Sequence, residues 1–348
     1  MRRMNTVPRQ IMLAGGAGLL VMALVSQVAA QTSLSSGVPA VIASKMPDRS
    51  VSDWLLRMHE ASRRRAYVGT FVVSAGGAMS SARIWHVCDG EQQMERVESL
   101  TGAQRSTFRH NDQVVTFLPD RRVVVTEKRE SLGVFPNLLQ SNDSSIAQFY
   151  RVQVIGGERV AGYVSDVVQL QPQDELRFGY RIWTEKKTGL VVKLQILDVA
   201  GRVLEQAAFS ELQLDAPVNM TQLTQMMANT QGYQVEKPDL VKTSSAAEGW
   251  ILKTAVPGFK SMSCYRRSVG AVDAHPANTF QWIFSDGLAS VSLFVEAFDD
   301  RLHVQSGSTA MGATHTLTRR MGDWWLTVVG EVPPLTLAAF AQRLERKK

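Results

Sequence analysis

The stretch from Arg159 to Leu212 constrains the fold of this chain more than any other. It contains four strand-like runs separated by short breaks that carry Pro, Gly or charge: Arg159–Leu170, Arg177–Thr184, Leu190–Asp198 and Val203–Leu212. Short strands at such regular spacing are typical of antiparallel sheets, whereas βαβ units alternate their strands with helices. The stretch therefore predicts an antiparallel meander, and with it a mainly β fold.

Turn signals predict further hairpins on both sides of the meander. They are Asp89-Gly90, Pro119-Asp120-Arg121, Gly156-Gly157, Ser285-Asp286-Gly287 and Met321-Gly322-Asp323. Gly232–Gly249 lies between the first three of these turn signals and the last two, and it is polar and contains Pro238. We interpret it as a linker, so the length of the chain and this break together predict two domains.

Three helices are expected beside the strands. Ser50 and Asp53 form a capping-box pattern before an apolar stripe of Val51, Trp54, Leu55 and Met58. A methionine-rich stripe at Met220, Leu223, Met226 and Met227 is interpreted as a docked core helix rather than a methionine-rich binding surface. Thr336 is predicted to cap the last helix, which carries Leu337, Phe340, Ala341 and Leu344 on one side.

Residues 1–30 read as a secretory signal peptide. Arg2, Arg3 and Arg9 form a basic region before the apolar run Ile11–Val25, and Val28-Ala29-Ala30 is a small-residue cleavage site. The alternative is a membrane anchor, but the run is shorter than the roughly 20 apolar residues that a span needs. Residues 31–46 are then a disordered leader. Loss of the three arginines lowers the formal charge from +6 to +3, which leaves no basic footprint for nucleic acid.

The chain has two cysteines, Cys88 and Cys264, 176 positions apart. An exported protein can keep a disulfide. The sequence leaves open whether these two residues pair, because spacing alone cannot place two Cβ atoms within reach.

No catalytic signature stands out. His59-Glu60 begins like a zinc-protease helix, but Arg63 stands where the second histidine must be. His86 and Cys88 share a strand face without a third ligand. No Gly-x-Ser-x-Gly elbow and no phosphate loop occur. We therefore expect no enzyme activity, no cofactor and no metal site.

Binding is the better interpretation. A curved sheet with an apolar concave face can enclose a cavity. The candidate lining residues for a lipid cavity are Phe71, Val73, Trp85, Val115, Phe117, Val123, Phe135 and Leu138. A filled core without ligand space is the alternative, and the sequence does not separate the two. In the second half, Trp282, Phe284, Trp324 and Trp325 beside Arg319 and Arg320 have the composition of a protein-binding patch, or else fill a small core.

Several motifs resemble one family. In the first half they are Glu95–Leu100 before Gly102, Arg159–Gly162, Arg177–Trp183 and Thr188–Leu190; in the second half they are Ser285–Ser292 and Thr327–Pro333. In this order they are similar to the RseB/MucB family of sigma-E regulators, over nearly all of the mature chain.

The resemblance implies a fold. Residues 47–215 would form an unclosed antiparallel β-barrel with packed helices, similar to the lipoprotein carriers LolA and LolB. Residues 216–249 would be a helix and linker, and residues 250–348 a smaller α+β domain.

The resemblance also implies a function. Such proteins are periplasmic and bind the periplasmic part of an RseA/MucA-like anti-sigma factor, which they protect from the site-1 protease. Binding of lipid or lipopolysaccharide makes such a protein release the anti-sigma factor, and proteolysis of the anti-sigma factor then frees the envelope-stress sigma factor. The anti-sigma contact would involve Trp282, Phe284, Asp286, Arg319, Arg320, Trp324 and Trp325. Two alternative functions stay open: a lipid or lipoprotein carrier and a secreted hydrolase. The oligomeric state stays open as well, with a homo-oligomer among the alternatives.

Overall fold

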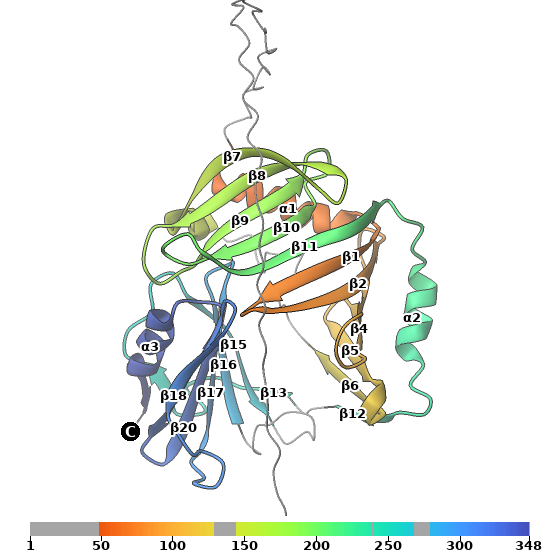
Figure 1. The fold of residues 1–348 in the computed structure, drawn as a ribbon. Coiled ribbons are helices and arrows are strands. Elements are labelled where there is room, and N and C mark those ends of the chain that lie inside the picture. Colours follow the sequence, from red (N-terminus) through yellow and green to blue (C-terminus); the bar gives the residue numbers. More distant parts are fainter. Residues whose placement is uncertain (1–48, 129–143, 238–239, 268–278, 348) are drawn as a thin grey trace, which may run out of the picture. The chain divides into compact units, whose positions relative to one another are not determined.

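The first helix begins where the capping box predicts. The computed structural model describes residues 49–128, 144–237, 240–267 and 279–347 (Figure 1). Helix α1 spans Val51–Arg64, and Ser50 and Asp53 exchange both capping hydrogen bonds. Its apolar stripe is buried, as expected: Val51, Trp54, Leu55 and Met58.

A twelve-stranded sheet contains the meander. Its order is β12-β6-β5-β4-β3-β2-β1-β11-β10-β9-β8-β7. The strands are β1 (Tyr67–Ala75), β2 (Ala78–Cys88), β3 (Gln93–Ser99), β4 (Ser106–His110), β5 (Gln113–Leu118), β6 (Val123–Lys128), β7 (Tyr150–Val160), β8 (Tyr163–Pro172), β9 (Gly179–Glu185), β10 (Val191–Leu197), β11 (Val203–Leu214) and β12 (Gln234–Glu236). Two short 3-10 helices accompany them, η1 (Pro119–Arg121) and η2 (Ser144–Gln148). The end strands β12 and β7 do not pair with each other, so the sheet is unclosed, as predicted.

The meander of β8 to β11 is confirmed, but the predicted hairpin at Gly156-Gly157 is wrong. β7 runs unbroken through both glycines, and the register with β8 shifts between Val154 and Gly156. The turn lies at Ala161 and Gly162, which both have positive φ, 47° and 86°. Paired glycines can mark a bulge as well as a turn, and the sequence pattern does not separate the two.

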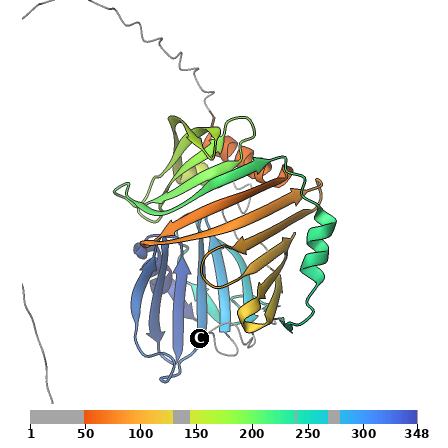
Figure 2. The same cartoon turned by 45° about the vertical axis from the view of Figure 1, so that its right-hand side comes forward.

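A seven-stranded sheet follows in the order β13-β15-β16-β17-β20-β19-β18. Its strands are β13 (Leu240–Lys242), β15 (Lys260–Arg267), β16 (Thr279–Ser285), β17 (Ser290–Ala297), β18 (Gly307–Met311), β19 (Thr314–Met321) and β20 (Trp324–Gly330). Helix α3 (Pro334–Arg343) packs on β19 and β20, and β14 (Trp250–Leu252) pairs with β21 (Leu344–Arg346). The mixture of one sheet and a packed helix agrees with the α+β expectation (Figure 2).

One local expectation in this half needs correction. The cap of α3 is Pro333, and Thr336 lies inside the first turn, where its hydroxyl donates to the Leu176 carbonyl at 2.7 Å. Cys264 lies on β15, and both cysteine thiols are free. The Glu296 side chain of β17 is buried.

The segment between the two sheets contributes a strand to each of them. Helix α2 (Met220–Ala228) is capped by Asn219 and docks through Leu223 and Met227. After it, β12 pairs in parallel with β6, and β13 pairs with β15 of the other sheet. One short stretch of chain therefore belongs to both sheets.

Candidate functional site

The residues expected to line one lipid cavity lie on two faces of the first sheet. Directly paired strand residues share a face, and neighbours along a strand alternate. Phe71 pairs with Ala82, which shares the face of Ile84, whereas Trp85 points the other way. The register then carries the Trp85 face through Arg96 and Phe108 to Val115.

The prediction of a single lining is therefore wrong. Phe71, Val73 and Val123 lie on one face, and Trp85, Val115 and Phe117 lie on the other. Phe135 and Leu138 lie outside the described residues. The face of Phe71 is packed: the Phe71 and Phe209 rings meet edge to face at 6.1 Å within a buried cluster that includes Ala61 of α1.

The opposite face carries a pocket beside α2. We call it the Tyr233 pocket; it has a volume of about 360 Å³. Met226 contributes to it from α2, and Asn229 and Tyr233 contribute from the segment that follows α2. Its aromatic wall is continuous, because the rings of Phe117 and Tyr233 meet at 5.3 Å and those of Phe108 and Phe117 at 5.6 Å. A pocket of this size with an apolar wall suits a small amphiphilic ligand.

Two arginines lie at the rim of the Tyr233 pocket. Arg96 donates to Glu98 at 2.7 Å, and its guanidinium lies over the Trp85 ring at 4.8 Å. Arg105 is exposed and has no ion-pair partner among the described residues. The pocket therefore combines an apolar wall with an uncompensated positive charge.

A buried ion pair joins the two sheets, which belong to one compact unit, Asp48–Lys348. Nε of Arg177 donates to Asp286 Oδ2 at 2.9 Å, and both side chains are fully shielded from solvent. Arg177 also pairs with Asp174, donates to the Pro257 carbonyl at 2.6 Å and lies over the Phe149 ring at 4.2 Å. Asp286 receives the N–H groups of Leu288 and Ala289 as well.

Burial raises the pKa of the Asp286 carboxyl, while those two N–H groups and Arg177 oppose the rise. A buried charge of this kind is tolerated only when its partners satisfy it. Asp286 was predicted to contact a partner protein; the structure instead uses it to hold the two sheets together.

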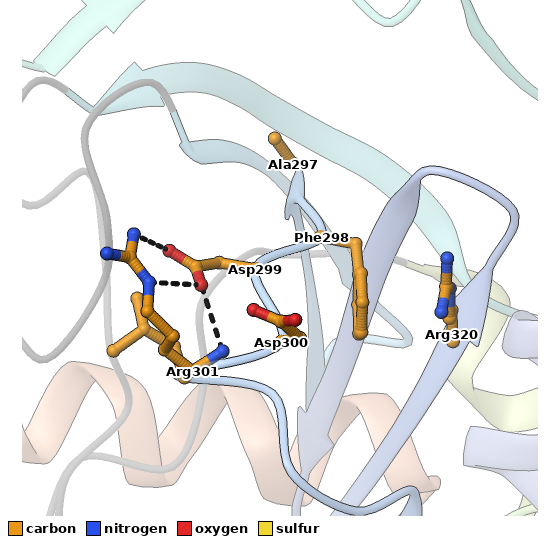
Figure 3. A pocket seen from close by; sticks show the side chains of 7 residues that line it. Ala297, Phe298, Asp299, Asp300, Arg301 and Arg320 are labelled. Atoms are coloured by element: carbon orange, nitrogen blue, oxygen red, sulfur yellow. Dashed lines mark hydrogen bonds and ion pairs between the residues drawn. The ribbon is translucent and has the colours of Figure 1, made fainter.

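A second pocket lies at one end of the second sheet. We call it the Phe298 pocket; it has a volume of about 840 Å³ and is lined by residues 297–302 and Arg320. Figure 3 shows Asp299 and Arg301 paired at its wall, with Phe298 beside Arg320. The hydrogen bonds from Arg301 lower the pKa of the Asp299 carboxyl to about 2. The loop between β17 and β18 is thus held by its own ion pair.

Sequence reasoning missed a buried histidine behind this pocket. His303 Nδ1 accepts the Asp299 N–H at 2.9 Å, so Nε2 carries the proton that it donates to Glu296 at 2.9 Å. Its ring stacks on Trp325 at 4.8 Å. The alternation along β17 gave no sign of this network, because the partner of Glu296 comes from a loop.

The structure divides the residues expected to contact the anti-sigma factor. Trp282 and Phe284 belong to the buried core of the second sheet, and Trp325 is buried against His303. Trp324 and Arg319 are half-buried, and Arg320 is exposed. Core packing therefore accounts for three of the four aromatic residues, and Arg320 is the exposed member of the set.

Among the residues that the structure describes, no group of three or more metal-ligating side chains comes together. Within the same residues, no helix is long and apolar enough to cross a membrane.

Comparisons with known proteins agree with the two-part organisation. Residues 50–227 match the MucB/RseB N-terminal domain, and residues 244–345 match the MucB/RseB C-terminal domain. The chain is 30% identical to the sigma factor AlgU regulatory protein MucB of Pseudomonas aeruginosa, over 86% of this chain and 92% of that protein. It is 22% identical to the sigma-E factor regulatory protein RseB of Escherichia coli, over 84% of this chain and 89% of that protein.

The fold also resembles solved structures. A crystal structure of MucB in complex with the periplasmic part of MucA aligns with a TM-score of 0.64 at 27% identity, covering 85% of this chain and 99% of that one. MucB by itself aligns with a TM-score of 0.59 at 26% identity, covering 85% and 98%. With both family domains matched in order along most of its length, the chain belongs to the MucB/RseB family.

Proposed function

We propose that this chain is a periplasmic regulator of envelope-stress signalling. It is exported by the signal peptide of residues 1–30, binds the periplasmic part of a membrane anti-sigma factor and protects it from site-1 proteolysis. The observation that carries the proposal is the likeness, over 85% of the chain, to MucB in complex with the periplasmic part of MucA. A likeness of that extent includes residues of both sheets, which supports the proposal.

Lipid or lipopolysaccharide releases the partner in this proposal. A ligand shifts a binding equilibrium only by its differential affinity for the two states. The Tyr233 pocket offers a route: its ligand would touch Arg96 and Phe108 on the sheet and also Met226 and Tyr233 on the segment that leads to β12 and β13. Since β13 belongs to the second sheet, movement of this segment would displace a strand of that sheet.

The first experiment titrates the mature chain with the periplasmic segment of the anti-sigma factor from the same genome, by calorimetry. Micromolar or tighter binding supports the proposal, and purified site-1 protease should then cleave the segment more slowly in the complex. Absence of binding by folded protein would favour the lipid-carrier alternative.

A second experiment tests release. Dodecyl phosphate is added to the complex, with uncharged dodecyl maltoside as the matched probe. The phosphate should lower the affinity for the anti-sigma segment and the maltoside should not. Arg105→Ala should weaken the effect and Arg121→Ala, at an exposed arginine outside the pocket lining, should leave it unchanged. If saturating dodecyl phosphate leaves the affinity untouched, the coupling is wrong.

A further inference from the structure

One edge of the second sheet lacks the features that normally prevent strand pairing. Sheet edges are usually kept short, charged or bulged, because their free backbone groups attract other strands. β7 has its bulge at Gly156 together with Glu158 and Arg159. β12 and β13 have three residues each. These three edges of the described sheets are protected.

β18 is different. It ends the strand order of the second sheet, and among the described strands it pairs only with β19. Its sequence from Gly307 to Met311 contains no charge and no proline, and all five residues are exposed. Its register with β19 is continuous. An uncharged, exposed edge without a bulge is a template for an added strand.

The hairpin geometry identifies which backbone groups are free. Met311 and Thr314 flank a two-residue turn in which Gly312 has a φ of 60°. Residues that flank such a turn exchange both hydrogen bonds, and bonded and non-bonded pairs then alternate. Thr309 therefore faces β19, whereas Ser308 and Ala310 direct their N–H and C=O groups outward.

An oriented positive charge marks the Gly307 end of this edge. Gly307 donates its N–H to the Thr318 hydroxyl at 3.2 Å, and Arg320 follows two residues later on the same face of β19. The Arg320 guanidinium lies over the Phe298 ring at 3.8 Å, and its Nε donates to the Gly322 carbonyl at 2.8 Å. It is exposed and forms no ion pair with a carboxylate of the described chain.

Apolar side chains accompany Arg320. Leu302 in the Phe298 pocket is 63% exposed, and Val304 in the same loop is 86% exposed. A charge-assisted hydrogen bond to a carboxylate is roughly twice as strong as a neutral one, so this guanidinium favours an acidic side chain. The end of the edge thus suits an apolar residue next to an acidic one.

We propose that β18 receives an extended, acidic segment of the anti-sigma partner as an added strand. The Ser308 and Ala310 backbone groups hold the segment, and Arg320 binds its carboxylate. The proposal rests on the function proposed above and adds the mode of recognition.

The test is calorimetry of the full mature chain with the periplasmic segment of the anti-sigma factor. Ala310→Pro deletes one outward N–H and leaves the bonds to β19 in place, so we expect binding to weaken about tenfold or more. Ala310→Val keeps that N–H and should bind like the original chain. Arg320→Glu should weaken binding about tenfold, while Arg121→Glu, an exposed charge reversal on the first sheet, should not.

Hydrogen exchange on the original chain gives an independent readout. In the complex the Ser308 and Ala310 amides should gain protection, whereas the Thr309 and Met311 amides, already bonded to β19, should not change. This readout holds even if Ala310→Pro fails to fold.

Three outcomes overturn the inference. If the original chain binds but Ala310→Pro binds equally and the two amides stay unprotected, only the strand addition is wrong. If the original chain does not bind at all, the proposed function falls with it. If the amides are protected without partner and the molecular mass doubles, a second copy occupies the edge instead.

Discussion

Arg177 and Asp286 meet at 2.9 Å in a junction where neither side chain reaches solvent. Arg177 precedes β9 of the first sheet, and Asp286 lies in the turn between β16 and β17 of the second. The pair therefore fixes the position of one sheet against the other. The function proposed above, in which a ligand on one sheet changes the binding of a partner to the other, requires such a defined contact, because a loose connection would transmit no preference between states.

Arg177→Met should destabilise the protein strongly. The substitution leaves the Asp286 carboxylate buried without its cation, which typically costs about 3–5 kcal/mol. The free energy of unfolding, measured with urea, checks this. Arg202→Met removes the exposed partner of Asp198 and should change the free energy of unfolding by less than about 1 kcal/mol. Equal effects of the two substitutions would contradict a structural role for the buried pair.

Gly258→Ala should also disturb the junction. A Cβ at Gly258, where φ is +79°, would overlap Nη2 of Arg177. Gly201, where φ is +77°, has nothing within 4 Å of such a Cβ. Both substitutions incur the left-handed strain of about 1–2 kcal/mol, and only Gly258→Ala adds an overpacking cost of about 1–3 kcal/mol. Thermal unfolding of the two variants side by side isolates the overlap; identical midpoints would argue against it.

Leu223→Ala should loosen helix α2 from the first sheet. Leu223 is 6% exposed and packs in the cluster that includes Met94, Phe108 and Phe117. Truncation of a buried leucine costs about 2–5 kcal/mol. Gln222→Ala, on the exposed side of α2, should have little effect on the unfolding free energy. Partner affinity measured on the same variants shows whether α2 influences the second sheet.

The stability of the protein should fall on acidification because of His86. Burial lowers the pKa of His86, whose ring stacks on Tyr67 at 4.8 Å and whose Nδ1–H donates to the Arg65 carbonyl. Because the folded-state pKa is depressed, the unfolded chain takes up the proton first as the pH falls. The contribution of neutral His86 to the free energy of unfolding is therefore present above about pH 6.5 and is lost as the pH falls through the folded-state pKa.

Urea unfolding at a series of pH values between neutral and mildly acidic conditions measures how steeply the free energy of unfolding falls with pH. His86→Phe should flatten this dependence, because the variant has no proton to gain at that position. A titration midpoint for His86 above 6.5, followed by NMR, would contradict the prediction.

Local patterns predicted most elements of the fold. The capping box of Ser50 and Asp53, the meander of β8 to β11 and the hairpin at Met321-Gly322-Asp323 all appear where the sequence indicates. The family motifs also lie in the sequence itself. These features depend on neighbouring residues, since caps, turns and the two-residue period of a strand are set within a few positions of the chain.

Three corrections show what local patterns cannot decide. Gly156 and Gly157 satisfy a turn signal, but the turn forms at Ala161 and Gly162 and leaves them inside β7. Asp286 and Glu296 look like exposed charges, yet Arg177 and His303 bury them.

The sequence by itself therefore determined the mainly β class, the meander of β8 to β11 and the family. Only the tertiary structure decided that Phe71 and Trp85 lie on opposite faces, that Asp286 joins the two sheets and that β18 is an edge strand of the second sheet as far as the structure describes it. The physical reason is that faces, buried charges and free edges depend on which distant strands become neighbours, and register and burial are fixed by those long-range pairings.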